Sequence, residues 1–157
     1  MSAAAAAFWR SYLRQLPPGH PHLAGEVYSV FAFDDTPAVS DTLAALVLAG
    51  RKKATASLPI QSEAEGTRLP EAGDLSIVTL GDGTPVALIE TTDVSLVPFG
   101  AVDAAFAAEE GEGDLSLAWW RAAHTRFFGR VVARLGGTLD DTSVVVCERF
   151  RLLFVGH

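Results

Sequence analysis

Apolar residues recur at helical spacing at the start of the chain. An alanine run opens this segment, and Phe8, Tyr12 and Leu16 recur on one face of a helix drawn through it. Alanine is the best helix former, and the Pro17-Pro18-Gly19 tripeptide interrupts the pattern. The sequence therefore predicts an N-terminal helix over about residues 2–16.

Later segments carry clearer signals for helix ends. Pro37 suits a first helical turn, and Gly50 stands where that helix would end. The longest helix is predicted from a cap at Ser116 to about Leu135. A short helix is predicted over Phe99–Ala108, directly before an acidic, glycine-rich loop.

Segments typical of β-strands are mixed with these helices, without a regular βαβ repeat. The predicted strands are Glu26–Phe33, Ala54–Leu58, Asp74–Leu80, Pro85–Val94 and Val144–Val155. The turn at residues 81–83 joins two of them into a hairpin, and Gln61–Glu71 is predicted as a polar loop. We expect one α+β domain over residues 1–157, built on a small, mixed and largely antiparallel barrel or sheet.

Composition narrows the classes of function. Apolar residues make up 49% of the 157-residue chain, which is enough for a hydrophobic core and excludes global disorder. Neither a membrane span nor a leader is recognisable, so we expect a cytoplasmic protein with no membrane partner. The net charge of −7 weighs against an extended, nonspecific nucleic-acid binder, which is normally basic. The single cysteine, Cys147, excludes an internal disulfide and a cysteine-cluster zinc site.

The first candidate for chemistry is the basic segment between a predicted helix and a predicted strand. Lys52 precedes Thr55 by three residues, which can place an ammonium beside a hydroxyl and lower its pKa, or hold an anionic group. The alternative is structural, because cations such as Arg51 and Lys53 also complement the dipole at a helix C-terminus. The spacing permits both interpretations.

The second candidate is the acidic loop Glu109–Asp114. Either Glu110 or Glu112 could act as a general base if its carboxylate enters a cleft, and the sequence does not choose between them. A divalent cation could bind such carboxylates, although no metal ligand set is predicted and no cofactor is required. The alternative is a solvated acidic turn before a helix N-terminus.

Two further segments, the longest predicted helix and the last predicted strand, carry polar residues with both a structural and a functional interpretation. Trp120, Arg121 and His124 lie close together on the longest helix, either as core packing or as a surface for a base and its phosphate. In the last strand, alternation places Glu148 on the apolar face with Phe150. A carboxylate there needs a partner, and the default expectation is an ion pair.

Together these segments resemble the ASCH domain family. The sequence Gly50-Arg51-Lys52-Lys53-Ala54-Thr55 is similar to the GxKxxT signature, and the wider chain looks like the bacterial single-domain branch of about this length. The segments that carry this resemblance are 43–47, 54–57, 69–74, 89–94, 110–114, 120–121 and 146–150. The resemblance implies a PUA-like fold, a small β-barrel flanked by helices with a cleft across it.

The resemblance also implies ligands and roles. ASCH domains are thought of as RNA-binding or RNA-processing modules, and relatives imply cleavage of single-stranded RNA or amide hydrolysis of an acylated cytidine. For the amidohydrolase type of relative, the resemblance implies that Lys52 and Thr55 match the catalytic lysine and threonine and that the acidic partner falls within Glu109–Glu112. Members often have Arg where this chain has Ser57.

The resulting hypothesis is a hydrolase that acts on RNA or a modified nucleoside. Lys52, Thr55 and Glu110 (or Glu112) are the predicted catalytic residues. The predicted binding residues are Ser57, Lys53, Glu112, Trp120, Arg121 and His124. A non-catalytic binding module for RNA or a modified nucleoside is the alternative, and a protein–protein adaptor is a third. The sequence predicts no oligomeric state.

Overall fold

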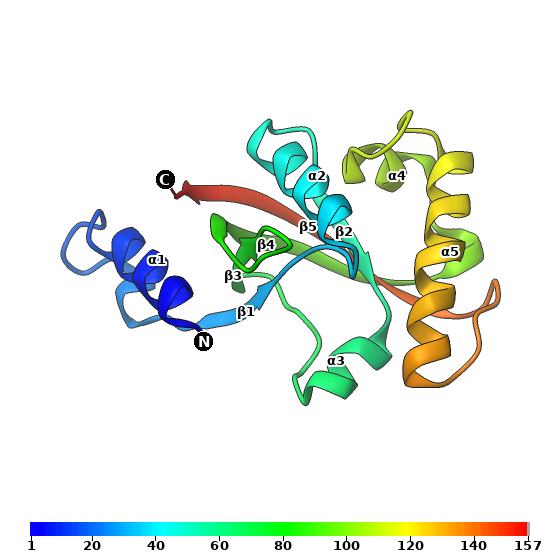
Figure 1. Ribbon diagram of the computed structural model, residues 1–157, viewed down its shortest axis with the longest axis horizontal. Coiled ribbons are helices and arrows are strands. Elements are labelled where there is room, and N and C mark those ends of the chain that lie inside the picture. The colour runs from blue at the N-terminus through cyan, green and yellow to red at the C-terminus, as the bar shows by residue number, and fades with distance from the viewer. Residues whose placement is uncertain (157) are drawn as a thin grey trace.

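A five-stranded mixed sheet forms the centre of the computed structural model, which describes residues 1–156 (Figure 1). The strands are β1 (Val27–Phe31), β2 (Ala54–Ser57), β3 (Leu75–Thr79), β4 (Pro85–Pro98) and β5 (Val144–Val155), in the order β1-β3-β4-β5-β2. Three neighbouring pairs are antiparallel, and β1 runs parallel to β3. The long pairing of β4 with β5 links the two ends of the molecule.

Helices cover both faces of this sheet. Their bounds are α1 (Ala3–Leu13), α2 (Pro37–Leu48), α3 (Pro59–Glu65), α4 (Ala104–Glu110) and α5 (Leu117–Leu135), with 3-10 turns at Pro21–Ala24 and Phe99–Ala101. Ile77 of β3 packs towards α1, whereas the next residue, Val78, packs towards α2. Since successive side chains of a strand point to opposite faces, α1 and α2 lie on opposite sides of the sheet.

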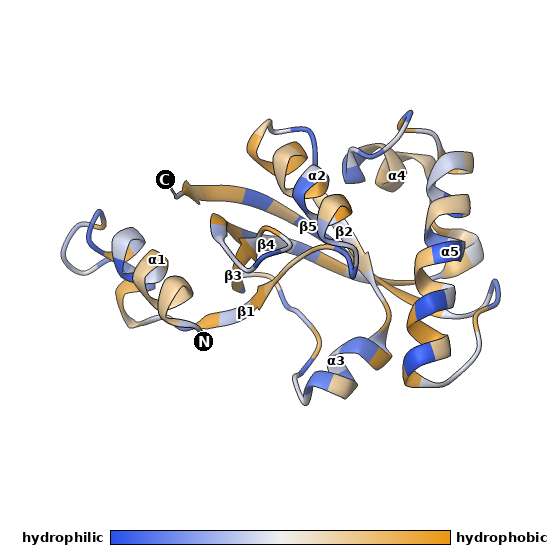
Figure 2. Cartoon of the chain, in the orientation of Figure 1, coloured by the Kyte–Doolittle hydropathy of each residue, from blue (hydrophilic) through white to orange (hydrophobic). Residues whose placement is uncertain are grey.

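A separate apolar cluster fills the end of the molecule where the candidate site lies. There α4 and α5 pack against β2 and β5, with Phe128 and Val145 fully buried between them. Figure 2 shows the strands largely orange, whereas α3 and α5 carry blue stretches. Among the described residues, no helix is long and apolar enough to cross a membrane.

The α+β class with a PUA-like arrangement is confirmed, and the structure refines its form. In the described chain the sheet stays open, because β1 and β2 are its two edges and are not hydrogen-bonded to each other. The parallel pairing of β1 with β3 also departs from a purely antiparallel arrangement. These two strands come from distant segments, and such non-local pairing leaves no local signal in the sequence.

Three predicted element bounds were wrong. Residues 61–65, predicted as loop, belong to α3, where the Gln61 side chain accepts a hydrogen bond from the Leu58 amide at 2.8 Å and Pro59 occupies the first turn. The predicted helix over Phe99–Ala108 is divided, because Asp103 caps a new helix by accepting from the Phe106 amide. Strand β4 continues to Pro98, four residues beyond the predicted Val94.

Candidate functional site

Lys52 lies at the floor of the candidate site. After α2, the amides of Arg51 and Lys52 both donate to the Leu46 carbonyl, and this tight turn directs the lysine inward, where it is only 2% exposed. Its Nζ donates to the Ala54 carbonyl at 2.9 Å, to Glu110 Oε2 at 2.9 Å and to Glu112 Oε2 at 2.7 Å. An ammonium has three N–H donors, so these contacts satisfy all of them.

The acidic residues reach Lys52 because the backbone allows a close approach. Glu110 is the last residue of α4, and Gly111 follows with a φ of 74°. A Cβ atom at Gly111 would lie 2.3 Å from the carbonyl oxygen of Arg51, so only glycine fits there. The Lys53 amide also donates to the Glu109 carbonyl at 2.8 Å, which joins the end of α4 to the start of β2.

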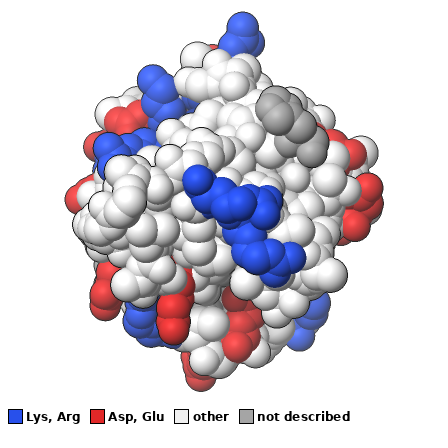
Figure 3. Space-filling view, turned by 90° about the vertical axis from the view of Figure 1, so that its left-hand side faces the viewer, with Lys and Arg blue, Asp and Glu red and all other residues white. Residues whose placement is uncertain are grey.

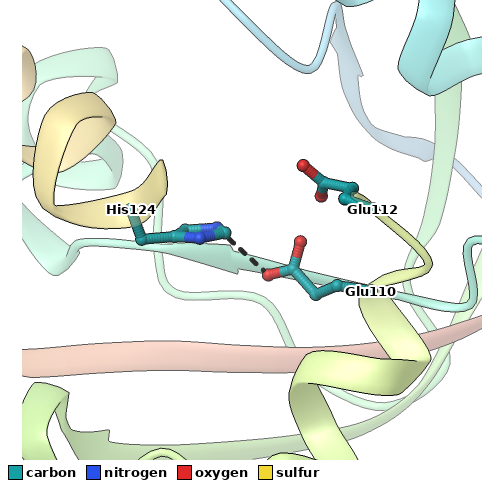
Figure 4. A group of neighbouring side chains, drawn as sticks. All are labelled: Glu110, Glu112 and His124. Atoms are coloured by element: carbon teal, nitrogen blue, oxygen red, sulfur yellow. Dashed lines mark ion pairs between the residues drawn. The ribbon is translucent and has the colours of Figure 1, made fainter. Parts of the chain in front are cut away.

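The other oxygen of Glu110 contacts helix α5. Trp120 Nε1 donates to Glu110 Oε1 at 3.1 Å, and His124 Nε2 lies 3.3 Å from the same atom (Figure 4). His124 Nδ1 lies 2.9 Å from the Trp120 carbonyl oxygen, so each ring nitrogen faces an oxygen atom. The Trp120 and His124 rings are stacked at 4.1 Å. Glu110 is thereby held on both oxygens.

The two carboxyl groups differ in electrostatics. Burial alone would raise the pKa of Glu110, but the nearby Lys52 ammonium and the hydrogen bond with His124 outweigh it and hold that pKa well below its usual range. Burial raises the pKa of Glu112 to about 7, with the neighbouring Glu110 adding to the effect and Lys52 opposing it. Burial works against the charge of Lys52, yet Glu110 and Glu112 raise its pKa above the usual value.

A cleft of about 520 Å³ opens above these groups. Thr55 and Trp119 line it together with Lys52, Glu110, Glu112 and His124. Its rim carries Arg126 and Arg130, which lie one turn apart on α5. Arg130 pairs with Asp35 at 3.4 Å, whereas Arg126 forms no ion pair within residues 1–156.

The structure brings the predicted catalytic residues together. Lys52, Thr55, Glu110 and Glu112 line the same cleft, and the predicted binding residue His124 lines it with them. These residues come from the turn after α2, from β2, from the end of α4 with its loop, and from α5.

The remaining predicted binding residues lie elsewhere. Trp120 is buried beneath the cleft, and Ser57 lines a neighbouring compartment. Arg121 donates to the carbonyls of Phe99 and Val102 at 2.7 and 3.1 Å, so it ties α5 to the preceding segment and does not line the cleft. Lys53 is exposed and does not line the cleft.

The sequence prediction missed several lining residues. Trp119, which was not among the predicted site residues, lines the cleft and packs over Gly113. The expected ion pair for Glu148 was wrong, because its Oε1 accepts a hydrogen bond from the Thr91 hydroxyl at 2.9 Å. The i, i+4 spacing of Arg126 and Arg130 was a usable signal for the rim.

A metal ion would have to compete with Lys52. Ligand atoms of Glu110, Glu112 and His124 lie within 4.8 Å of one another, and carboxylate and imidazole donors suit several divalent cations. However, the Lys52 ammonium already bridges the two carboxylates. Lys52 therefore already supplies the positive charge that a metal ion would provide between Glu110 and Glu112.

The outer surface offers no extended basic track on the face viewed from the α1 side. Figure 3 shows basic side chains in separate groups, one near the centre of that face and others at its margins, where acidic side chains are interspersed, with neutral surface between the groups. A duplex or long polynucleotide binder needs a continuous basic surface. The compact cleft is therefore the better place to look for a ligand.

An open α+β sheet with a lysine and two carboxyl groups in a cleft defines a small PUA-like domain. The sequence profile of the ASCH domain matches residues 29–154, and the chain belongs to the ASCH domain family. A crystal structure of an ASCH domain from Lactobacillus crispatus JV V101 is 34% identical, with a TM-score of 0.88 over 97% of this chain and 95% of that one.

A second solved structure supports the same fold. A protein from Enterococcus faecalis V583 is 30% identical, with a TM-score of 0.82 over 99% of this chain and 91% of that one. No protein with a curated description matches the chain.

Proposed function

We propose that the cleft binds a nucleotide, a short single-stranded RNA or a modified nucleoside, and hydrolyses it. One observation carries this proposal: the buried Lys52 shares its charge with Glu112, a carboxyl group with a pKa of about 7, at the floor of an open cleft. A general base works best when its pKa lies near the working pH. Membership of the ASCH family supports a ligand of the RNA type.

Glu112 is the better candidate for the general base. Glu110 is 1% exposed, both of its oxygens are hydrogen-bonded, and its low pKa makes it a poor proton acceptor. Glu112 lines the cleft and can take up a proton near neutral pH. Glu110 then serves to hold Lys52, with Trp120 and His124 holding Glu110 in turn.

The reaction can follow two courses in this cleft. In an acylated nucleoside, the Thr55 hydroxyl attacks the carbonyl carbon and passes its proton to Glu112, which returns it to the departing amine; water then hydrolyses the acyl-threonine ester. In RNA, the ribose 2′-hydroxyl attacks phosphorus and gives its proton to Glu112, which passes it to the departing 5′-oxygen; the 5′-alcohol leaves and a 2′,3′-cyclic phosphate remains. Lys52 stabilises the negative charge that develops on the carbonyl or phosphoryl oxygen.

Lys52 becomes available to the substrate as Glu112 is protonated. In the structure all three ammonium donors are already used, one of them by Glu112. When Glu112 accepts a proton its negative charge disappears, which weakens its hold on Lys52 at the moment when charge develops on the substrate.

Because all three N–H donors of Lys52 are already used, a second candidate function is also favoured. If Glu112 keeps its contact with Lys52 in the complex, the ammonium is a structural cation that never contacts the ligand. The chain would then be a non-catalytic binding module for RNA or a modified nucleoside. In that case Thr55 only donates or accepts a hydrogen bond.

A turnover assay separates these functions. Single-stranded RNA and N4-acylated cytidine are offered separately, each with and without a divalent cation, to the wild type, Glu112→Gln and Arg51→Ala. We expect product from the wild type and a loss of about 10²- to 10⁴-fold in Glu112→Gln. Arg51 is exposed and lies outside the cleft, so Arg51→Ala is the matched control. Ligand binding by the wild type without product from either substrate would favour the binding module.

A further inference from the structure

A second compartment of about 160 Å³ adjoins the cleft. Phe33, Thr55, Ala56 and Phe127 line both spaces, so they form the boundary between them. A ligand that occupies both spaces must therefore cross Thr55. The first space holds every acid–base group of the proposed reaction, and the second holds none of them.

Two carboxyl groups line the second compartment, and Glu148 is the half-buried one, whereas Glu65 is exposed. Glu148 is the register partner of Thr55 across β2 and β5, which places the two side chains on the same face of the sheet. Its Oε1 accepts the Thr91 hydroxyl, and it forms no ion pair with a cation among the described residues. Burial raises the pKa of this carboxyl group. A half-buried carboxyl with no cation beside it can still exchange hydrogen bonds with a ligand.

The rest of the lining suits a flat, uncharged ring. Tyr28 and Phe31 contribute aromatic surface, and Ser29, Ser57 and Ser76 contribute hydroxyl groups. No lysine or arginine lines this space, whereas Lys52 and two arginines line the first one. A phosphate group has no partner in the second compartment, but a heterocycle finds stacking surface and hydrogen-bonding groups there.

We propose that the second compartment is a subsite for the single heterocyclic ring of a pyrimidine nucleotide, recognised through Glu148. The sugar and phosphate then lie in the first compartment, towards Lys52 and Arg126, as the RNA course of the proposed reaction requires. An acyl group on N4 of cytidine would lie at the opposite end of the ring, away from Lys52 and Glu112, so this subsite applies to the RNA course alone. This inference rests on the proposed function in one respect, namely that the cleft binds nucleotides. It adds a residue that determines specificity and a direction for the ligand, with the sugar passing over Thr55.

Calorimetry with two probes tests this arrangement. Uridine 5′-monophosphate and ribose 5-phosphate share a sugar and a phosphate, and only the first carries a ring. We expect the wild type to bind the nucleotide at least about tenfold more tightly, which corresponds to one or two net hydrogen bonds and a stacking contact. This comparison needs no variant.

Variants then assign the preference to Glu148. Glu148→Ala is expected to weaken nucleotide binding about tenfold and to leave ribose 5-phosphate binding unchanged. Glu148→Gln keeps an acceptor oxygen and the side-chain volume, so its nucleotide affinity should stay within about twofold of the wild type. Glu63→Gln, at an exposed position on α3 outside both compartments, is the matched control.

The outcomes separate this subsite from the proposed function. If the wild type and Glu148→Ala bind both probes with equal affinity, the subsite is wrong and the nucleotide-binding cleft stands. If the wild type binds neither probe, the proposed function is wrong and the subsite with it. Equal weakening of both probes in Glu148→Ala would show a general structural effect and would also overturn the subsite.

Discussion

Replacing Lys52 with methionine is expected to be strongly destabilising. The side chains of Lys52 and Glu110 are each 1% exposed, and their Nζ and Oε2 atoms lie 2.9 Å apart. Methionine fills a similar volume but removes the charge, so Glu110 remains buried without its cation. Removing one partner of a buried ion pair costs about 3–5 kcal/mol, and we expect a loss of that size at pH 7.

The loss should depend on pH in a defined direction. In the wild type the folded-state pKa of Glu110 is well below its unfolded value, so its contribution to stability is present above the unfolded pKa. That contribution is lost as the pH falls through the folded pKa. Without Lys52, burial raises the folded pKa above the unfolded one, and the penalty grows as the pH rises. The difference between wild type and Lys52→Met should therefore be larger at pH 8 than at pH 5.

Urea titrations at both pH values measure this effect, provided that the m-value stays constant. The double variant Lys52→Met with Glu110→Gln removes both charges and should recover part of the loss, since no uncompensated charge then remains between them. Arg51→Ala, at the exposed neighbouring position, should change stability by less than about 0.5 kcal/mol. A loss below about 1 kcal/mol in Lys52→Met, or one that does not change with pH, would refute the reasoning.

Three further predictions concern the acidic loop and its support. Glu112 has a pKa of about 7 and must be deprotonated to act as a base, so turnover should increase as the pH rises through 7. The pH–rate profile of Glu112→Gln should lack this increase. Gly111→Ala should lose about 2–3 kcal/mol in urea titrations, because of its positive φ and the contact with Arg51; unchanged stability would show that the loop can move. Arg121→Ala should lose about 2 kcal/mol through its two carbonyl contacts, and a loss under 0.5 kcal/mol would contradict their structural role.

Local chemistry explains which parts of the fold could be predicted from the sequence. Pro37 begins α2, and the Ser116 side chain caps α5 by accepting from the Trp119 amide at 3.1 Å, so these helices start where expected. Helix α3 was missed because its seven residues carry too short an apolar pattern to show a period. The pairing of β1 with β3 was missed because it depends on tertiary packing.

The candidate site was predicted in its residues but not in its geometry. The GxKxxT segment indicates Lys52, and the acidic loop indicates a partner, yet the two are 58 residues apart at Lys52 and Glu110. Nothing local shows that Gly111 rests on the Arg51 backbone, which is what brings them into contact. The choice between Glu110 and Glu112 depends on burial and on the contacts from α5, and neither can be derived from spacing.

Two carboxyl groups that share one ammonium need not behave alike. Trp120 and His124 bind only Glu110, and this asymmetry fixes it as the permanent counter-charge of Lys52. Glu112 is bound by Lys52 without contacts from α5, and its pKa of about 7 leaves it free to change its charge near neutral pH. A proton on Glu112 removes one of the two attractions on Lys52, whereas a proton on Glu110 would remove the negative charge that accepts hydrogen bonds from both Lys52 and Trp120. In the proposed reaction, Glu112 therefore accepts and releases the proton. Glu110 stays ionised and holds Lys52 in place, because the contacts from α5 reach Glu110 alone.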